Sequence, residues 1–343
     1  MIEESYEDGA RLVADIGGTN ARFALERAPG RIGDVATLPC AGHAQFTDAV
    51  RAYLERHDGV RVRHAAIAIA NPVDGDLVKM TNHCWTFSIA QARAELGLDT
   101  LLVVNDFAAL AMSVPELAAS ELVQVGGGAP VTGGVVGLVG AGTGLGVAGL
   151  IPSGGRWTVL QSEGGHAAFS PMDAREQAIL DFCWGRWEHV SAERLVSGPG
   201  LSLIHEALAA QQGLSAPVMD PAEIVERALD GGDALCAEVL DAFCGMLGTV
   251  AANVAVTLCA RGGIYIGGGV VPRLGEWFAR SPFRARFENK GRFSGYTARI
   301  PCFVIHAPCP ALAGAAAMLE QHLFDGAAHG ALHANAGARH AHA

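Results

Sequence analysis

The chain has 343 residues, which corresponds to about two domains at a typical length of ~150 residues each. Half of the residues are hydrophobic, enough for a core in each domain. The formal net charge is −11, from 24 basic and 35 acidic residues, which argues against nucleic acid or an anionic membrane as a partner. Glycine is unusually frequent: it accounts for 44 of the 343 residues, almost twice the common share of about 7%. We therefore expect places where the backbone comes close to a ligand or to another segment.

The termini and the cysteines bear on the location of the protein. The first ten residues, MIEESYEDGA, are acidic and polar and predict neither a signal peptide nor a transit peptide. The 8 cysteines form no CxxC pair and no zinc-ribbon spacing, so we expect reduced, mostly buried thiols. The tail over 326–343 carries four of the 13 histidines among alanine and glycine; we expect it to be flexible, with adventitious metal binding as the alternative. These features predict a cytoplasmic protein.

The first half of the chain predicts alternating strands and helices. Leu12–Ile16 and Arg22–Leu25 read as two strands joined by Gly17-Gly-Thr-Asn20, a hairpin whose turn is expected to need positive φ. The elements that follow are a helix over 44–57, strands over 64–70 and 100–104, and a helix over 107–112 that Ser113-Val-Pro115 ends.

The second half opens with an uncharged stretch, Val131–Pro152, that is long enough to suggest a membrane span. Eight of its 22 residues are glycine, so two buried strands joined by a glycine turn fit better. A helix over 234–259 is apolar on most faces, which indicates a central position. The other expected elements are a strand over 157–161, a turn at 164–165, helices over 173–187, 201–212 and 221–229, a strand over 264–266 and a terminal helix over 310–324.

Two glycine-rich hairpins look like one design used twice: LVADIGGTNARFAL (12–25) and GLVGAGTGLGVAGLI (137–151). Together with the alternating strands and helices they predict an α/β chain built of two similar halves. Open backbone N–H groups in such turns are suited to phosphate, and Asp15 adds a carboxylate beside which Mg²⁺ bridging phosphates would sit. The alternative is a pair of purely structural hairpins. A third glycine run, Gly267-Gly-Gly269, follows a buried strand and favours the phosphate interpretation.

Other nucleotide sites do not fit the sequence. No GxxxxGK[ST] motif is present, which excludes a P-loop. Residues 144–149, GLGVAG, match GxGxxG, but the following Leu150-Ile-Pro-Ser-Gly-Gly155 is unsuited to the helix that must receive a pyrophosphate.

Two further groups of polar residues are candidate ligands. Glu163-Gly-Gly-His166 is formally ExxH, but the two glycines predict a turn that aims both side chains at a small polar ligand; an unrelated surface turn is the alternative. Asn105 and Asp106 follow a buried strand, where ligands of α/β proteins tend to bind. Asp106 would accept a hydroxyl proton there, whereas the structural alternative is an N-cap for the next helix.

Taken together, these motifs resemble those of bacterial glucokinases, in order and at plausible spacings from about residue 12 to 322. The matching segments are Asp15-Ile-Gly-Gly-Thr-Asn-Ala-Arg22, Met80-Thr-Asn-His83 with Trp85 and Phe87-Ser88, Asn105-Asp-Phe107, Gly142-Thr-Gly-Leu-Gly146, Ser162-Glu-Gly-Gly-His166, Ser191-Ala-Glu-Arg194, Ser197-Gly-Pro-Gly200 and Ile266-Gly-Gly-Gly-Val270.

The resemblance implies a two-lobed actin-like ATPase fold of the ribonuclease H-like kind, each lobe a mixed sheet with flanking helices. The smaller lobe would comprise 12–114 with about 305–325, and the larger 115–304, between flexible termini at 1–11 and 326–343. ATP phosphates would be clamped by Asp15, Ile16, Gly17, Gly18, Thr19 and Asn20 and by Gly142, Thr143 and Gly144. Gly267, Gly268 and Gly269 would lie near the adenosine, and Mg²⁺ would bind Asp15 through water. Asp106 corresponds to the catalytic base, and the glucose ligands would be Asn105, Glu163, His166 and Glu193.

Related families and other donors define the alternatives. Sugar kinases and repressors of the ROK family carry a cysteine-rich zinc motif after the GGH segment, whereas this chain has only Cys183 there. A kinase for another hexose and an actin-like ATPase acting as a scaffold or regulator stay open, as does polyphosphate in place of ATP. The resemblance also implies a homodimer.

Overall fold

The computed structural model describes residues 5–57, 59–80, 83–214 and 218–340, with side chains up to Asp325. The chain divides into two compact units, residues 1–117 with 308–343 as unit 1 and residues 118–307 as unit 2. Thr81 and Asn82 of the resemblance motif lie outside the described residues, as do the outermost residues of both expected flexible termini.

Unit 1 is built on a five-stranded sheet with the order β3-β2-β1-β4-β7. β1 is antiparallel to β2 and parallel to β4, and β4 is parallel to β7, so the sheet is mixed. A small two-stranded sheet pairs β5 with β6. The strands are β1 (Ala10–Ile16), β2 (Asn20–Glu26), β3 (Ile32–Pro39), β4 (Val62–Ile69), β5 (Leu77–Lys79), β6 (Thr86–Ser88) and β7 (Thr100–Asn105).

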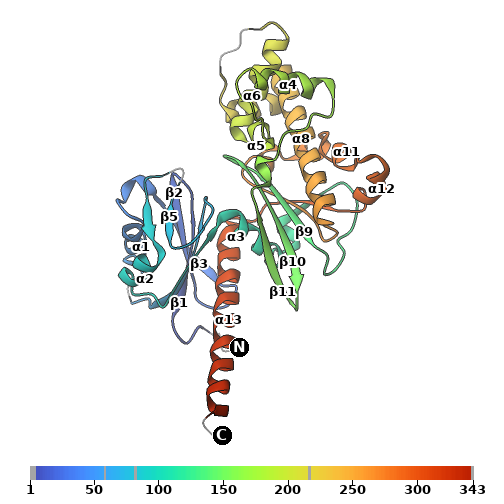
Figure 1. The fold of residues 1–343 in the computed structure, drawn as a ribbon. Coiled ribbons are helices and arrows are strands. Elements are labelled where there is room, and N and C mark those ends of the chain that lie inside the picture. The colour runs from blue at the N-terminus through green and yellow to red at the C-terminus, as the bar shows by residue number, and fades with distance from the viewer. Residues whose placement is uncertain (1–4, 58, 81–82, 215–217, 341–343) are drawn as a thin grey trace. The chain divides into compact units, whose positions relative to one another are not determined.

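Helices cover both faces of this sheet. Alternate residues of β1 point to opposite faces and therefore pack against different helices. Leu12 packs in one cluster with Phe46 of α1, and Val13 packs in another with Leu312 of α13. α13 runs along α3 (Figure 1), and a Cβ at Gly314 would overlap the carbonyl oxygen of Ala109. The helices of unit 1 are α1 (Phe46–Leu54), α2 (Ile89–Glu95), α3 (Asp106–Ser113) and α13 (Pro310–His340).

Both ends of the chain differ from the sequence expectation. The terminal helix was expected to end at Phe324, but α13 continues to His340, because the tail is rich in alanine, the strongest helix former. The N-terminal extension was expected to be flexible, but the Tyr6 N–H donates to the Arg27 carbonyl at 3.2 Å. Asp8 also contacts His64 Nε2 of β4 at 2.9 Å. Residues 5–9 therefore contact the residue that follows β2 and the first half of β4 instead of extending into solvent.

Unit 2 is built on a six-stranded sheet with the order β11-β10-β9-β12-β13-β8. β9 is antiparallel to β10 and parallel to β12, which is parallel to β13, so the arrangement of β1, β2, β3, β4 and β7 recurs. The prediction of two similar halves is confirmed, and the uncharged stretch forms β9 and β10, as predicted. The strands are β8 (Leu122–Val125), β9 (Val136–Ala141), β10 (Leu145–Ser153), β11 (Arg156–Ser162), β12 (Gly263–Gly267) and β13 (Cys302–Ile305).

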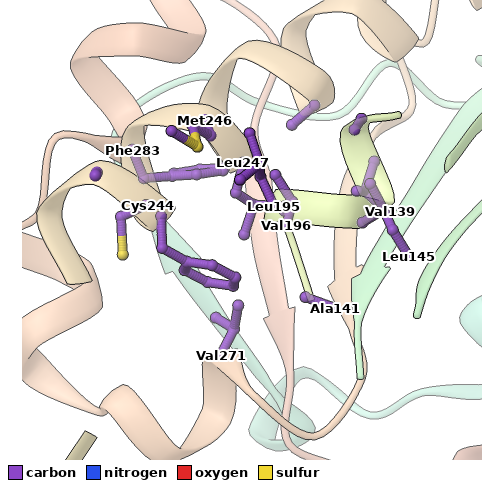
Figure 2. Packing of buried hydrophobic residues seen from close by; sticks show 14 of the residues in the cluster. Val139, Ala141, Leu145, Leu195, Val196, Cys244, Met246, Leu247, Val271 and Phe283 are labelled. Atoms are coloured by element: carbon purple, nitrogen blue, oxygen red, sulfur yellow. The ribbon is translucent and has the colours of Figure 1, made fainter. Parts of the chain in front are cut away.

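The long helix α8 lies in the core of unit 2, as predicted, and Figure 2 shows the packing around Met246 and Leu247. By length and composition α8 alone among the described helices is apolar enough to cross a membrane, but 78% of its apolar window is buried inside the protein, as in a core helix. The helices are α4 (Ala174–Trp184), α5 (Ala192–Leu195), α6 (Gly198–Gln211), α7 (Pro221–Leu229), α8 (Ala234–Leu258), α9 (Val271–Leu274), α10 (Glu276–Arg280), α11 (Phe283–Glu288) and α12 (Ser294–Thr297).

Candidate active site

The turn between β1 and β2 is closed by backbone hydrogen bonds. The Gly17 N–H donates to the Asn20 carbonyl at 3.0 Å, and the Cys40 N–H donates to the Thr19 carbonyl at 2.9 Å. The prediction of positive φ in this turn is wrong, because the glycines with positive φ in the described part of the chain include neither Gly17 nor Gly18. These glycines need another explanation than backbone conformation.

Asp15 precedes this turn and faces Arg22 directly across the β1–β2 pair. The Arg22 Nη1 lies 3.4 Å from Asp15 Oδ2, and about a quarter of the Asp15 side chain (26%) is exposed. Burial raises the pKa of Asp15 above its usual value, and the positive charge of Arg22 opposes this shift only in part. Arg22 therefore offsets only part of the cost of burying the Asp15 carboxylate. A second cation that reached the exposed part of this side chain would stabilise its charged form further.

Asn105 and Asp106 sit where β7 passes into α3. The Asn105 side-chain oxygen accepts hydrogen bonds from the N–H groups of Phe107 and Ala108, at 3.0 Å each. Asn105 is therefore the N-cap of α3, and the structural alternative is confirmed for this residue. Asp106 is the first residue of the helix, and its Oδ1 accepts from the Phe107 N–H at 2.7 Å. The positive end of the helix dipole favours a carboxylate at this position.

The equivalent turn of unit 2, between β9 and β10, is braced by other elements. The Gly198 N–H at the start of α6 donates to the Gly142 carbonyl at 2.7 Å. The Leu145 N–H donates to Glu193 Oε2 at 3.0 Å, and a Cβ at Gly144 would overlap that carboxylate. A helix start and an acidic side chain therefore hold the turn of unit 2.

Glu163, His166 and Glu193 come together beside this turn. His166 Nε2 lies 3.9 Å from Glu163 Oε2, and His166 Nδ1 lies 3.8 Å from Glu193 Oε1. The side chains of His166 and Glu163 are 62% and 66% exposed, and that of Glu193 is 33% exposed. Gly164–His166 forms a short 3₁₀ turn, so the prediction of a turn instead of an α-helix is confirmed. The cluster presents two carboxylates and an imidazole to solvent, which suits hydrogen bonding to hydroxyl groups.

A short backbone pairing brings Glu193 to His166 from 27 positions along the chain. Ala168 forms an isolated antiparallel bridge with Ser191, and the Ala192 N–H donates to the Ala167 carbonyl at 2.8 Å. His189 Nε2 donates to the His166 carbonyl at 3.0 Å. This pairing links the turn at Gly164–His166 to α5, which carries Glu193.

Within the part of the chain that the structure describes, three of the predicted ATP-binding glycines have no contact or backbone angle that requires glycine. Gly17, Gly142 and Gly269 do not have positive φ, and a Cβ on them would meet at most the Asn20 carbonyl oxygen, 3.8 Å away. Gly268 differs, because its φ is +81° and its Cβ would overlap Ala141. The first three leave open space over the backbone, as close approach of a nucleotide would need, with phosphate expected at Gly17 and Gly142 and adenosine near Gly269.

A metal ion would depend on its ligand for most of its coordination. In the part of the chain that the structure describes, no group of three or more His, Cys, Asp or Glu residues could hold a metal ion. Asp15 alone is therefore too few ligands for a resident Mg²⁺ site, but it fits an ion that arrives already bound to phosphates.

Sequence reasoning missed the residues that hold the site together. Ser197 caps α6 by accepting from the Gly200 N–H at 3.1 Å, and Gly198 braces Gly142 as described above. Both belong to a matching motif, Ser197-Gly-Pro-Gly200, to which no role had been given. The contacts of Arg22 and His189 were also not indicated by the sequence. Each of them contacts a residue that comes near it only through the pairing of β1 with β2 or through the bridge between Ala168 and Ser191.

The fold and the sequence agree on the class of this protein. A solved glucokinase from an Antarctic psychrotroph superposes with a TM-score of 0.84 at 34% identity, covering 91% of this chain and 99% of that one. The fold is thus that of the sugar kinases with an actin-like ATPase architecture. The glucokinase family model matches residues 12–322, and the chain belongs to the glucokinase family.

Two curated relatives of different length illustrate what the chain is similar to. A glucokinase of Neisseria meningitidis is 54% identical over 313 residues, which cover 91% of this chain and 95% of that protein. A bifunctional protein of Paraburkholderia xenovorans is 56% identical over 319 residues, which cover 93% of this chain. The chain spans about half the length (50%) of this bifunctional relative.

Proposed function

We propose that this protein transfers the γ-phosphoryl group of ATP to the 6-hydroxyl group of glucose and so forms glucose 6-phosphate. The observation that carries the proposal is the cluster of Glu163, His166 and Glu193 beside the glycine turn of β9 and β10. A sugar needs several hydrogen-bond partners at once, and this cluster offers them next to a turn suited to phosphate. The 54% identity to a glucokinase of nearly the same length supports the choice of glucose.

ATP is assigned to the glycine turns of both units. Backbone N–H groups of Asp15–Asn20 and of Gly142–Gly144 would hydrogen-bond the phosphates, and Gly267–Gly269 would lie near the adenosine. The open space over Gly17, Gly142 and Gly269 supports this assignment. Mg²⁺ bound to the phosphates would supply charge neutralisation, with Asp15 as its protein contact through water.

Asp106 is assigned as the general base. Its carboxylate would accept the proton of the sugar 6-hydroxyl while that oxygen forms a bond to the γ-phosphorus and the bond from phosphorus to the β–γ bridging oxygen breaks. ADP leaves with the electron pair of that bond. Asn105 uses its side-chain oxygen for the cap of α3, so it would donate to the sugar through its amide nitrogen, which now donates to the Asn71 carbonyl at 3.3 Å.

The proposal also includes a homodimer located in the cytoplasm, and two lobes that correspond to the two units. Light scattering coupled to size-exclusion chromatography measures the subunit number directly. A mass near 35.5 kDa would show a monomer and contradict the dimer.

The test of the function is the formation of glucose 6-phosphate, followed with purified protein through a coupled dehydrogenase. Glucose, mannose and fructose are compared as acceptors by the ADP formed from ATP, and ATP and polyphosphate are compared as donors by the glucose 6-phosphate formed. We expect the highest kcat/KM with glucose and ATP. ATP hydrolysis that does not depend on any sugar would contradict the proposal and favour an ATPase that acts as a scaffold or regulator.

A further inference from the structure

A second candidate binding site lies in unit 2, at the end of β12 opposite to the glycine run. A cavity of about 600 Å³ is lined by the loop at Gly128–Val131, by Arg261 and by the segment Tyr296–Ile300. Arg261 lies just before β12, whose five residues lead to Gly267 and the glycine run at its far end. At a rise of about 3.3 Å per residue, the cavity is roughly 13 Å or more from that run.

Two arginines line this cavity without a counter-charge. Neither Arg261 nor Arg299 forms an ion pair within residues 5–57, 59–80, 83–214 and 218–340. Both act on the phenol of Tyr296, whose pKa is raised mainly by burial and pulled downward by these two guanidinium groups. The guanidinium groups of Arg261 and Arg299 thus both lie near the Tyr296 phenol, in a chain whose net charge is −11. An anion would relieve the repulsion between them.

The walls that carry the arginines are fixed by contacts from behind. Arg284 donates to the carbonyls of Ala298 and Ile300, at 2.9 Å each, and so clamps the backbone on both sides of Arg299. The Val131 N–H donates to the Arg261 carbonyl at 2.9 Å. Because the backbone is already held, a ligand would pay little ordering entropy in this part of the protein.

Tyr296 contributes its ring to the wall of the cavity between the two arginines. Its hydroxyl oxygen is buried beside the thiol of Cys259 and does not face the open volume. The polar groups that a ligand would meet are therefore the two guanidinium groups.

We propose that this cavity binds the phosphate group of a small phosphate monoester, with Arg261 and Arg299 on the phosphate oxygens and the ring of Tyr296 as the wall between them. The planar guanidinium matches phosphate geometry and remains charged at all relevant pH values. The volume leaves room for a small organic group next to Val131 and Ile300. The inference concerns binding alone and does not depend on the reaction that the protein catalyses.

Calorimetric titration of the full chain tests the site, with inorganic phosphate and glycerol 3-phosphate as probes and glycerol as the uncharged control. Glucose and a nonhydrolysable ATP analogue with Mg²⁺ are present throughout, so that the glycine turns are occupied. We expect both phosphates to bind and each of Arg261→Ala and Arg299→Ala to weaken binding about tenfold. Arg292→Ala, an exposed arginine of the same unit, is the matched control and is expected to bind as the unchanged protein does. Stronger binding of inorganic phosphate than of glycerol 3-phosphate would contradict the proposed ester.

Alkylation of cysteines localises the ligand independently. Cys259 is exposed beside Tyr296, and Cys84 is an exposed cysteine of unit 1 that serves as an internal reference. Glycerol 3-phosphate is expected to slow alkylation of Cys259 by iodoacetamide, read by mass spectrometry, and to leave Cys84 unchanged. Undiminished binding in the double variant Arg261→Ala/Arg299→Ala, or equal protection of Cys84 and Cys259, would overturn the proposal. If the unmodified protein binds these phosphates but has no glucokinase activity, the proposed function is contradicted and the proposed phosphate site is not.

Discussion

The two units use the same strand order around a glycine turn but supply the acidic group in different ways. In unit 1 the carboxylate is part of the hairpin, because Asp15 precedes the turn on β1 itself. The corresponding residue of β9 is Gly140, which pairs with Gly267. In unit 2 the carboxylate is Glu193, which reaches the turn from α5 and accepts the Leu145 N–H. A repeated backbone design therefore receives its carboxylate from two different places in the chain.

The difference leads us to expect different tasks for the surroundings of the two turns. The turn of unit 1 has a half-buried carboxylate and open space at Gly17, which suit phosphates and their cation. The turn of unit 2 is also assigned to phosphate, but it is tied to an exposed cluster with His166 that suits hydroxyl groups. Substitutions in pairs, one in each unit, test whether this division holds.

The largest expected effect belongs to Asp106 of unit 1. Asp106→Ala and Asp106→Asn both remove the proposed base and should lower kcat by about 10²–10⁴-fold, with the KM for glucose changed little. Glu193→Gln of unit 2 keeps an oxygen for the Leu145 N–H and should mainly raise the KM for glucose, by about tenfold. Steady-state kinetics measures both. Near-normal turnover in Asp106→Asn would remove this residue from the mechanism.

A second pair compares the helix crossings that hold each unit. Gly314 of α13 faces the Ala109 carbonyl of α3, and Gly248 of α8 faces the Phe283 carbonyl of α11; at both sites a Cβ would overlap backbone. Alanine at either glycine should cost about 1–3 kcal/mol through overpacking. Hydrogen exchange is expected to increase in the unit that carries the substitution. Gly295→Ala, with open space around it, is the control that should leave exchange unchanged.

A third pair separates ligand binding from folding at the two turns. Gly17→Ala meets nothing closer than 3.8 Å and should leave the melting temperature unchanged, while the KM for ATP rises because the methyl group occupies space assigned to phosphate. Gly144→Ala collides with Glu193 and should raise the KM values of both ATP and glucose. An unchanged KM for ATP in Gly17→Ala, with stability intact, would mean that phosphate does not approach this turn.

The smallest expected effect is the pH dependence of Asp15. Burial raises its pKa in the folded state above the ordinary value of 3.8, so the native state binds more protons than the unfolded state in this window. The contribution of Asp15 to stability is thus present below pH 3.8 and is lost as the pH rises through the folded-state pKa. Asp15→Asn should gain stability relative to the unchanged protein between acidic and neutral pH, measured by thermal unfolding at each pH. A constant difference would show that Arg22 fully compensates the burial.

Local sequence was enough to identify the hairpins, most long helices and the turn at Gly164–His166, because hydrophobic periodicity and glycine spacing are properties of neighbouring residues. The elements that it did not predict are short or lie at sheet edges. β8 and β13 have four residues each, and the short helices α9 to α12 carry too few turns for a periodic pattern. In these segments burial against the rest of the unit decides the structure.

The sequence by itself determined the class of fold, the repeated glycine turns and the identity of the candidate site residues. Only the tertiary structure decided their arrangement: that Asn105 caps α3, that Ala168 and Ser191 pair and thereby bring Glu193 to His166, and that Arg261 and Arg299 line one cavity. It also showed that the turn at Gly17 does not need positive φ. The physical reason is that turns and helices depend on contacts between near neighbours, whereas a site depends on pairings between segments that are distant in the chain.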